Sequence, residues 1–206
     1  MDTAVDLYWL PLGAGGHSVR FNGLVFEAIA ARLQHRTRSD LYHSALEVQT
    51  GEARYVIEMA PTWSEPTSER GVVAEGAVAS RGLSRWALFR YEIRRWRDGR
   101  IPDADKAVES PQRLSHDPDV ARRILAHAPD VPKLVWGRDE RQAGEMWNSN
   151  SVIAWLLSSA GIDARQIRPP SGGRAPGWSA GLVIAQREER AVEVAAAACR
   201  RPRVAP

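Results

Sequence analysis

Two polar segments, far apart in the sequence, carry the side chains that could do chemistry. The first, LYHSALEV, places His43 in a run of β-prone residues, and the second, NSNSVIAWLL, places Ser149 between Asn148 and Asn150. Serine becomes a nucleophile when a neighbouring base takes its proton, and imidazole is the side chain most often used for this. Backbone N–H groups at the start of a helix, with Asn148 and Asn150, could stabilise or orient an oxyanion. Ser149 and His43 are therefore the candidate catalytic pair.

The second segment also has the features of an ordinary capped helix. Asn and Ser accept hydrogen bonds from the free N–H groups of a first turn, and Gly161 stands where a left-handed C-terminal cap is expected. From Val152 onward, apolar residues occupy most of the helix circumference, which predicts a buried helix over residues 150–160. Capping and catalysis both explain the segment, and the helix pattern alone does not decide between them.

A hairpin supplies a third candidate. The β-rich runs 42–49 and 53–60 are separated by Thr50 and Gly51. If the turn closes tightly around these two residues, His43 lies directly opposite Glu58, and a carboxylate there would orient the imidazole. A β-bulge would shift the register and move Glu58 to the other face. The alternative interpretation of the pair is a strand-end histidine with a solvent-exposed glutamate.

The remaining patterns predict the elements that must position these residues. VDLYWLPLG and residues 87–96 read as further strands, and NGLVFEAIAARLQ, DPDVARRILAHA and QREERAVEVAAAACRR as helices. Residues 169–181 are predicted to be a flexible Pro/Gly-rich loop, and residues 200–206 a disordered tail. The predicted fold class is α+β, with residues 1–206 as a single domain in which an antiparallel sheet packs against the buried helix.

Composition narrows the class of protein. The chain has 206 residues, of which 44% are hydrophobic and 26% charged, as expected for a globular domain. Cys199 is the only cysteine, which excludes an internal disulfide and a multi-cysteine metal site. The N-terminal segment reads neither as a secretory signal nor as a membrane span, so we expect a cytoplasmic protein with no membrane partner.

Charge and motifs argue against two further classes of ligand. Although the chain is basic, its acidic residues are interspersed and the net charge is only +3, so we do not expect a nucleic-acid partner. The GAGG at residues 13–16 places Ser18 where the last glycine of a dinucleotide-binding motif would fall. We therefore expect no cofactor, and no metal.

The sequence gives little information about the substrate. Arg90, or the nearby Arg94, Arg95 or Arg97, could bind a carboxylate or phosphate through a forked guanidinium contact. Trp147 lies next to the candidate nucleophile and could wall a pocket for a small molecule or peptide. The alternatives are an arginine-coated strand surface and a core tryptophan.

Together the two polar segments resemble the circularly permuted papain-like fold. This group includes the PPPDE-type isopeptidases, the lecithin–retinol acyltransferase family and the permuted bacterial amidases. PPPDE-type proteins carry H-S-x-x-E-V on a strand and N-C-N-H-F at the start of a helix, in the same order along the chain. The corresponding residues are His43, Ser44, Glu47 and Val48 on the strand, and Asn148, Ser149, Asn150, Ser151 and Val152 on the helix.

One position departs from the family pattern. Ser149 stands where the resemblance implies the catalytic cysteine, and a serine hydroxyl needs a well-placed base, whereas a cysteine reacts as a thiolate. Three hypotheses follow. The first is a serine-type hydrolase or acyltransferase that acts on amide or ester bonds through Ser149, His43 and Glu58. The second is a catalytically inactive pocket protein that binds a ligand or protein partner. The third is a structural or interaction domain.

Overall fold

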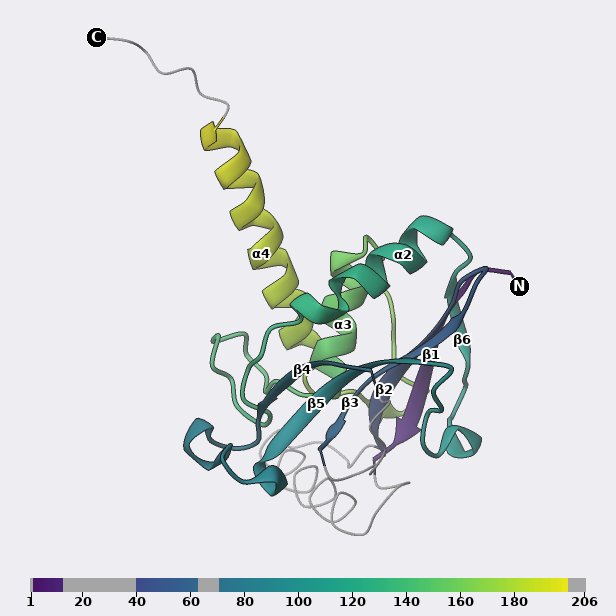
Figure 1. The fold of residues 1–206 in the computed structure, drawn as a ribbon, viewed down its shortest axis with the longest axis horizontal. Helices are drawn as coiled ribbons and strands as arrows, with labels where there is room; N and C mark the ends of the chain where they lie inside the picture. Colours follow the sequence, from purple (N-terminus) through teal and green to yellow (C-terminus); the bar gives the residue numbers. More distant parts are fainter. Residues whose placement is uncertain (1, 13–39, 63–70, 200–206) are drawn as a thin grey trace.

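A single β-sheet forms the body of the protein (Figure 1). The structure, a computed structural model, describes residues 2–12, 40–62 and 71–199. Seven strands within these ranges form the sheet, in the order β4-β5-β3-β2-β1-β6, with β7 paired to β2. The strands are β1 (Ala4–Pro11), β2 (Asp40–Gln49), β3 (Arg54–Pro61), β4 (Val72–Ala77), β5 (Arg90–Arg97), β6 (Gln112–Ser115) and β7 (Gly173–Arg174). All pairings are antiparallel except the short parallel one between β2 and β7.

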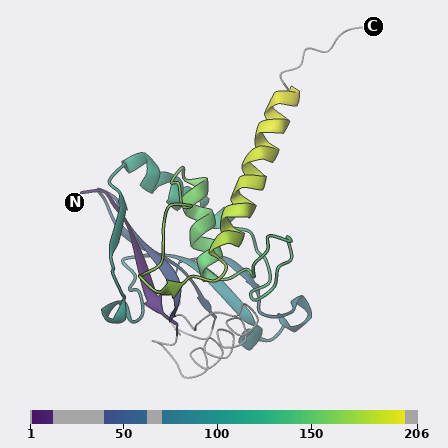
Figure 2. The ribbon, with the colours of Figure 1, turned by 180° about the vertical axis from the view of Figure 1, so that it is seen from behind.

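The helices α2 (Pro118–His127), α3 (Ser149–Ser159) and α4 (Trp178–Cys199) gather on one side of the sheet, as Figures 1 and 2 show from opposite directions. Asp117 caps α2 by accepting a hydrogen bond from the N–H of Asp119, with Pro118 in the first turn, as its sequence predicts. In α3, every residue from Ser149 to Leu157 is buried. The α+β class and the packing of a buried helix against an antiparallel sheet are therefore confirmed.

The two faces of the sheet carry different clusters because side chains alternate along each strand. The helix face, which packs against α2, α3 and α4, is the main hydrophobic core and includes Leu7, Trp9, Leu46, Ile57 and Ile93. The opposite face carries a smaller apolar cluster of Leu10, Ala45, Val56 and Ile101. Alternation along β3 and β5 places the buried polar residues Glu58, Glu92 and Arg94 on that opposite face as well.

The β2–β3 hairpin closes differently from the predicted register. Leu46 lies opposite Ile57, and Gln49 lies opposite Arg54, so the loop has four residues instead of two. The Thr50 hydroxyl accepts a hydrogen bond from the N–H of Ala53 and donates to its carbonyl, which holds this wider loop. The prediction that His43 lies directly opposite Glu58 is therefore wrong.

Several other boundaries differ from the predictions. Helix α4 begins at Trp178 and β7 occupies residues 173–174, so residues 169–181 are not one continuous loop. Residues 87–89 form a 3-10 turn, and β5 starts only at Arg90. The predicted helix NGLVFEAIAARLQ, the GAGG segment and the predicted tail 200–206 lie outside the described residues. No helix in the described ranges has the length and hydropathy required to cross a bilayer.

Candidate functional site

The start of α3 lies against the edge of β2, at the point where β2 parts from β3. The pairing of β2 with β3 covers residues 46–49, and its pairing with β7 covers residues 40–41. Between these two stretches, Asn150 donates a hydrogen bond from Nδ2 to the Tyr42 carbonyl at 2.9 Å, and its Oδ1 accepts one from Ser44 Oγ at 2.9 Å. Asn150 thus takes the place of a strand neighbour for this part of β2.

A reciprocal capping box fixes the first turn of α3. Asn148 Oδ1 accepts hydrogen bonds from the N–H groups of Asn150 (2.9 Å) and Ser151 (3.2 Å), and Ser151 Oγ accepts from the N–H of Asn148 (3.1 Å). Ser151 Oγ also lies 2.7 Å from the carbonyl oxygen of Gly177, to which it can donate. The amide groups of Asn148 and Asn150 both donate to the carbonyl of Pro176. Three of the four polar side chains in the NSNS segment therefore have structural partners.

Helix α4 approaches this turn so closely that two glycines are required. A Cβ atom at Gly177, whose φ is +86°, would lie 2.4 Å from Asn148 Oδ1, and one at Gly181 would lie 2.2 Å from the carbonyl oxygen of Ser151. Glu145 Oε2 accepts from the N–H of Gly177, at 3.0 Å. The start of α3 is thus packed between β2 and the start of α4.

Ser149 is the first residue of α3, and its side chain is the one polar group of the segment left out of this network. The residue is 7% exposed, and its hydroxyl takes part in no hydrogen bond within the described ranges. The partial positive charge of the helix N-terminus acts on this position. The location suits a nucleophile, but activation of a serine also requires a base.

His43 lies on the other side of the sheet. Its partner on β1 is Leu10, which belongs to the cluster on the opposite face, whereas the neighbouring Ser44 contacts Asn150 of α3. Burial lowers the pKa of His43 to about 4, and the charge of Asp103 offsets this only in part. The His43 side chain therefore lies on the face of the sheet opposite the one that packs against α3, and at neutral pH its imidazole is uncharged.

Glu58 has a different partner from the one predicted. Arg94, which is fully buried, places Nη1 2.8 Å from Glu58 Oε1 and Nε 2.5 Å from Glu92 Oε1. We call these three residues the Arg94 cluster. Because Arg94 lies opposite Glu58 in the β3–β5 pairing, the carboxylate is oriented by a guanidinium, whereas the hairpin register had suggested an imidazole.

The two predicted substrate-binding residues are engaged elsewhere, Arg90 beside Glu75 and Trp147 in the main core. Arg90 is partly buried at the start of β5, where alternation places it on the same face as Arg94, and it pairs with Glu75 at 3.6 Å. Trp147 is 1% exposed and belongs to the main core. The core alternative for Trp147 is therefore correct, and Arg90 does not border the start of α3.

Ser44 is the residue of this site whose role the sequence reasoning missed. It alternates with Tyr42 and Leu46 along β2, so period-two alternation alone puts it on the face that meets the buried helix. A small polar residue at such a position requires a polar partner, which Asn150 supplies.

The lowered pKa of His43 predicts a pH dependence of folding stability. Because its pKa falls from 6.5 to about 4 on folding, the unfolded chain binds more protons between these values. Stability is therefore lost as the pH falls through this window, by up to about 3 kcal/mol. Urea unfolding at pH 8 and pH 4.5 should show a smaller acid loss for His43→Gln than for the unmodified protein. An equal loss of stability in both proteins would show that folding does not lower the pKa of His43.

Within the described ranges, no three His, Cys, Asp or Glu side chains are grouped so as to hold a metal ion. In comparisons with known proteins, no family model, no curated protein and no solved structure matches the chain. The chemistry of the site is therefore argued from its own geometry.

Proposed function

We propose that this protein is a catalytically inactive domain with a permuted papain-like arrangement, which binds a ligand or protein partner and does not cleave a bond. The observation that carries the proposal is the direction of His43, whose side chain lies on the face of the sheet opposite the one that packs against α3. Without a base, the pKa of a serine hydroxyl is far too high for attack on an amide or ester.

Two features of the surroundings support the proposal. Glu58, the carboxylate of the predicted triad, is held by the buried Arg94. Asn148 and Ser151 are committed to the capping box, and Asn150 to β2 and Pro176. Asn150 joins α3 to β2, and Asn148 and Ser151 hold the first turn of α3 against residues 176–177, so all three polar groups have a structural role. The single cysteine fits the cytoplasmic location that forms part of this proposal.

The serine-hydrolase hypothesis remains the second candidate because one observation favours it. Ser149 is at a helix N-terminus with a hydroxyl that no described side chain engages, which is the position the resemblance assigns to the nucleophile. Its activity would require a base from a rearranged His43 or from another residue.

A fluorophosphonate probe separates the two candidates, because it labels activated serines covalently. We expect no labelling of the folded protein above that of Ser149→Ala, with Ser158→Ala, a serine farther along α3, as the matched control. Labelling that is lost in both Ser149→Ala and His43→Ala, but kept in Ser158→Ala, would contradict the proposal and establish the hydrolase.

A further inference from the structure

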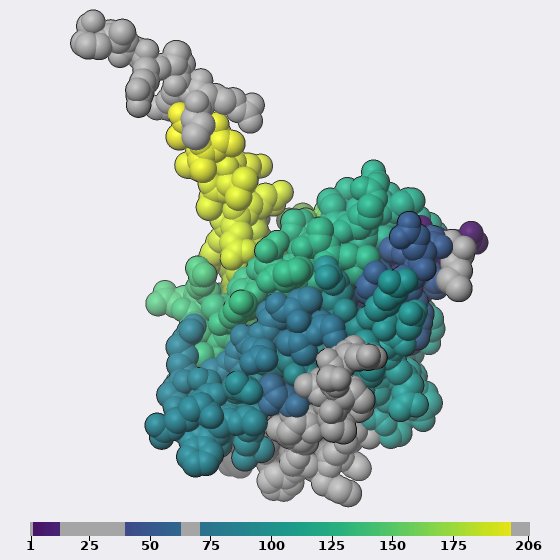
Figure 3. Space-filling view, in the orientation of Figure 1, coloured from purple at the N-terminus to yellow at the C-terminus, as the bar shows by residue number. Residues whose placement is uncertain are grey.

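The connection between β4 and β5, residues 78–89, lies at one corner of the molecule (Figure 3), and it exposes large apolar side chains. Trp86 is 60% exposed, Leu88 is 64% exposed and Leu83 is 37% exposed. We call this segment the β4–β5 loop. Three such side chains within six positions make a local apolar patch, which is a feature that usually marks a contact surface.

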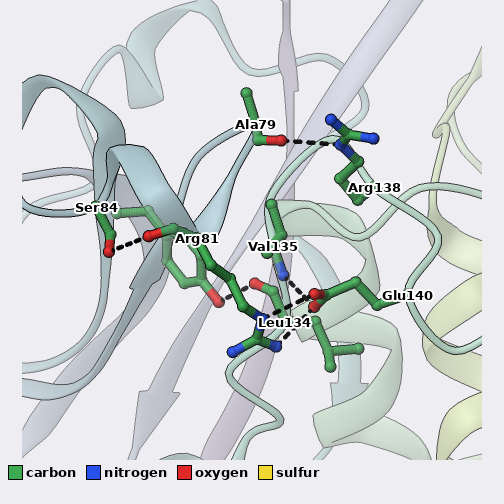
Figure 4. Close-up of polar contacts among 8 residues, drawn as sticks. Ala79, Arg81, Ser84, Leu134, Val135, Arg138 and Glu140 are labelled. Atoms are coloured by element: carbon green, nitrogen blue, oxygen red, sulfur yellow. Dashed lines mark hydrogen bonds and ion pairs between the residues drawn. The ribbon is translucent and has the colours of Figure 1, made fainter.

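The base of the loop is held in place by polar contacts, as Figure 4 shows. Arg81 binds Glu140 through two bonds, Nε to Oε1 and Nη2 to Oε2, each 2.9 Å long, and Glu140 also accepts from the N–H of Val135. Arg138 donates to the carbonyl of Ala79 at 2.8 Å. The loop therefore has a defined base.

Further contacts set the conformation of the tip. The loop forms two 3-10 turns, over Arg81–Leu83 and Ala87–Phe89, and the Thr62 hydroxyl donates to the carbonyl of Ala87 at 2.7 Å. Because these turns are hydrogen-bonded, the exposure of Trp86 and Leu88 belongs to an ordered conformation. An ordered loop loses little conformational entropy when its apolar tip is buried by a partner.

The charge of the loop favours an anionic partner. The loop and the first residue of β5 carry Arg81, Arg85 and Arg90 and no acidic residue. Glu140 and Glu75 neutralise Arg81 and Arg90, whereas Arg85 is exposed and makes no ion pair within the described part of the chain. A tryptophan and two leucines beside a free arginine suit the interface of an anionic bilayer, where indole sits at headgroup depth and arginine meets phosphate.

We propose that the β4–β5 loop is a membrane-surface contact, which inserts Trp86 and Leu88 into the interface of an anionic phospholipid bilayer. This differs from the expectation of no membrane partner, which rests on the lack of a spanning segment in the sequence. Such binding needs no membrane-spanning helix, and it is independent of whether Ser149 is catalytic. A nucleic acid would contact the arginine through its phosphates and the indole by stacking, but it would not bury the leucines. A bilayer would contact the arginine and bury both the indole and the leucines. The projecting shape of the loop also suits a deformable surface (Figure 3).

Vesicle co-sedimentation of the full chain tests the proposal. Vesicles of phosphatidylcholine with phosphatidylglycerol should bind the protein, and vesicles of phosphatidylcholine alone should bind it more weakly. Trp86→Ser with Leu88→Ser should weaken binding by about tenfold or more, since both side chains lose their apolar burial. Arg85→Gln should weaken binding to the anionic vesicles by about fivefold.

A matched control uses exposed apolar residues elsewhere. Val192 and Val194 on α4 are 69% and 70% exposed, and Val192→Ser with Val194→Ser should leave vesicle binding unchanged. All these substitutions are at exposed side chains, and circular dichroism verifies the folding of each variant. Absence of binding to anionic vesicles, or equal binding by the loop variant, would overturn the proposal. Self-association of the protein that the loop substitutions abolish, without vesicle binding, would overturn it in favour of a second copy as the partner.

Discussion

Replacing Arg94 with methionine is expected to lower the free energy of unfolding by about 3–5 kcal/mol. The Arg94 side chain is fully buried, with Glu58 and Glu92 both within ion-pair distance. Methionine fills a similar volume but leaves two buried carboxylates without this guanidinium. The large cost comes from removing a guanidinium that lies beside two buried carboxylates, since a buried ion pair by itself contributes little net stability.

Arg97→Met is the matched control, because this arginine is on the same strand and its side chain is 65% exposed. Its substitution should change stability by no more than about 0.5 kcal/mol. Urea unfolding followed by circular dichroism measures both. Adding Glu58→Gln and Glu92→Gln to Arg94→Met should recover part of the loss, because amides are cheaper to bury than carboxylates. Equal, small effects at positions 94 and 97 would show that the Arg94 cluster is not an important source of stability.

Asn150→Asp is expected to cost about 3–5 kcal/mol at neutral pH, although it changes a single side-chain NH₂ to oxygen. The Nδ2 group of Asn150 donates to the carbonyls of Tyr42 and Pro176, and the residue is 1% exposed. In the variant, a buried carboxylate oxygen faces two carbonyl oxygens. The loss should shrink in acid, where a protonated carboxyl can donate to one of them.

Asn148→Asp makes the same chemical change two residues away and should cost less than about 1 kcal/mol. Its Oδ1 accepts from the N–H groups of Asn150 and Ser151, a role that aspartate fills well, and the negative charge suits the helix N-terminus. One carboxylate oxygen would face the Pro176 carbonyl, but Asn148 is only partly buried, so this contact is more easily relieved than at Asn150. Thermal and urea unfolding should separate the two variants clearly. Equal costs would show that the amide of Asn150 does not hold α3 on β2.

Where the fold was predictable, local patterns agreed with tertiary packing. The apolar circumference after Val152 gave a buried helix, and Asp117 with Pro118 marked the start of α2. Strands β4, β6 and β7 were not predicted, because they are only two to six residues long and carry no sustained alternation.

The site was less predictable than the fold because it depends on register and on which face each side chain takes. The hairpin loop, in which Ala53 bonds to the Thr50 hydroxyl, has four residues instead of two, so Glu58 is not opposite His43. The surroundings of Ser149 depend on which β2 side chains contact α3. Because side chains alternate along β2, the residue in contact is Ser44. The pairing of Glu58 with Arg94 could have been predicted, since Glu92 and Arg94 lie on one face of β5 by alternation.

The central claim, that Ser149 has no base, is tested most directly by the pKa of a thiol at this position. In Ser149→Cys, with Cys199→Ser to remove the native thiol, the rate of alkylation by iodoacetamide as a function of pH reports that pKa. The account predicts a value within about one unit of the ordinary 8.5, lowered only by the helix N-terminus and unchanged by His43→Ala. A pKa depressed by several units that returns toward 8.5 in His43→Ala would reveal a thiolate–imidazolium pair and contradict the account.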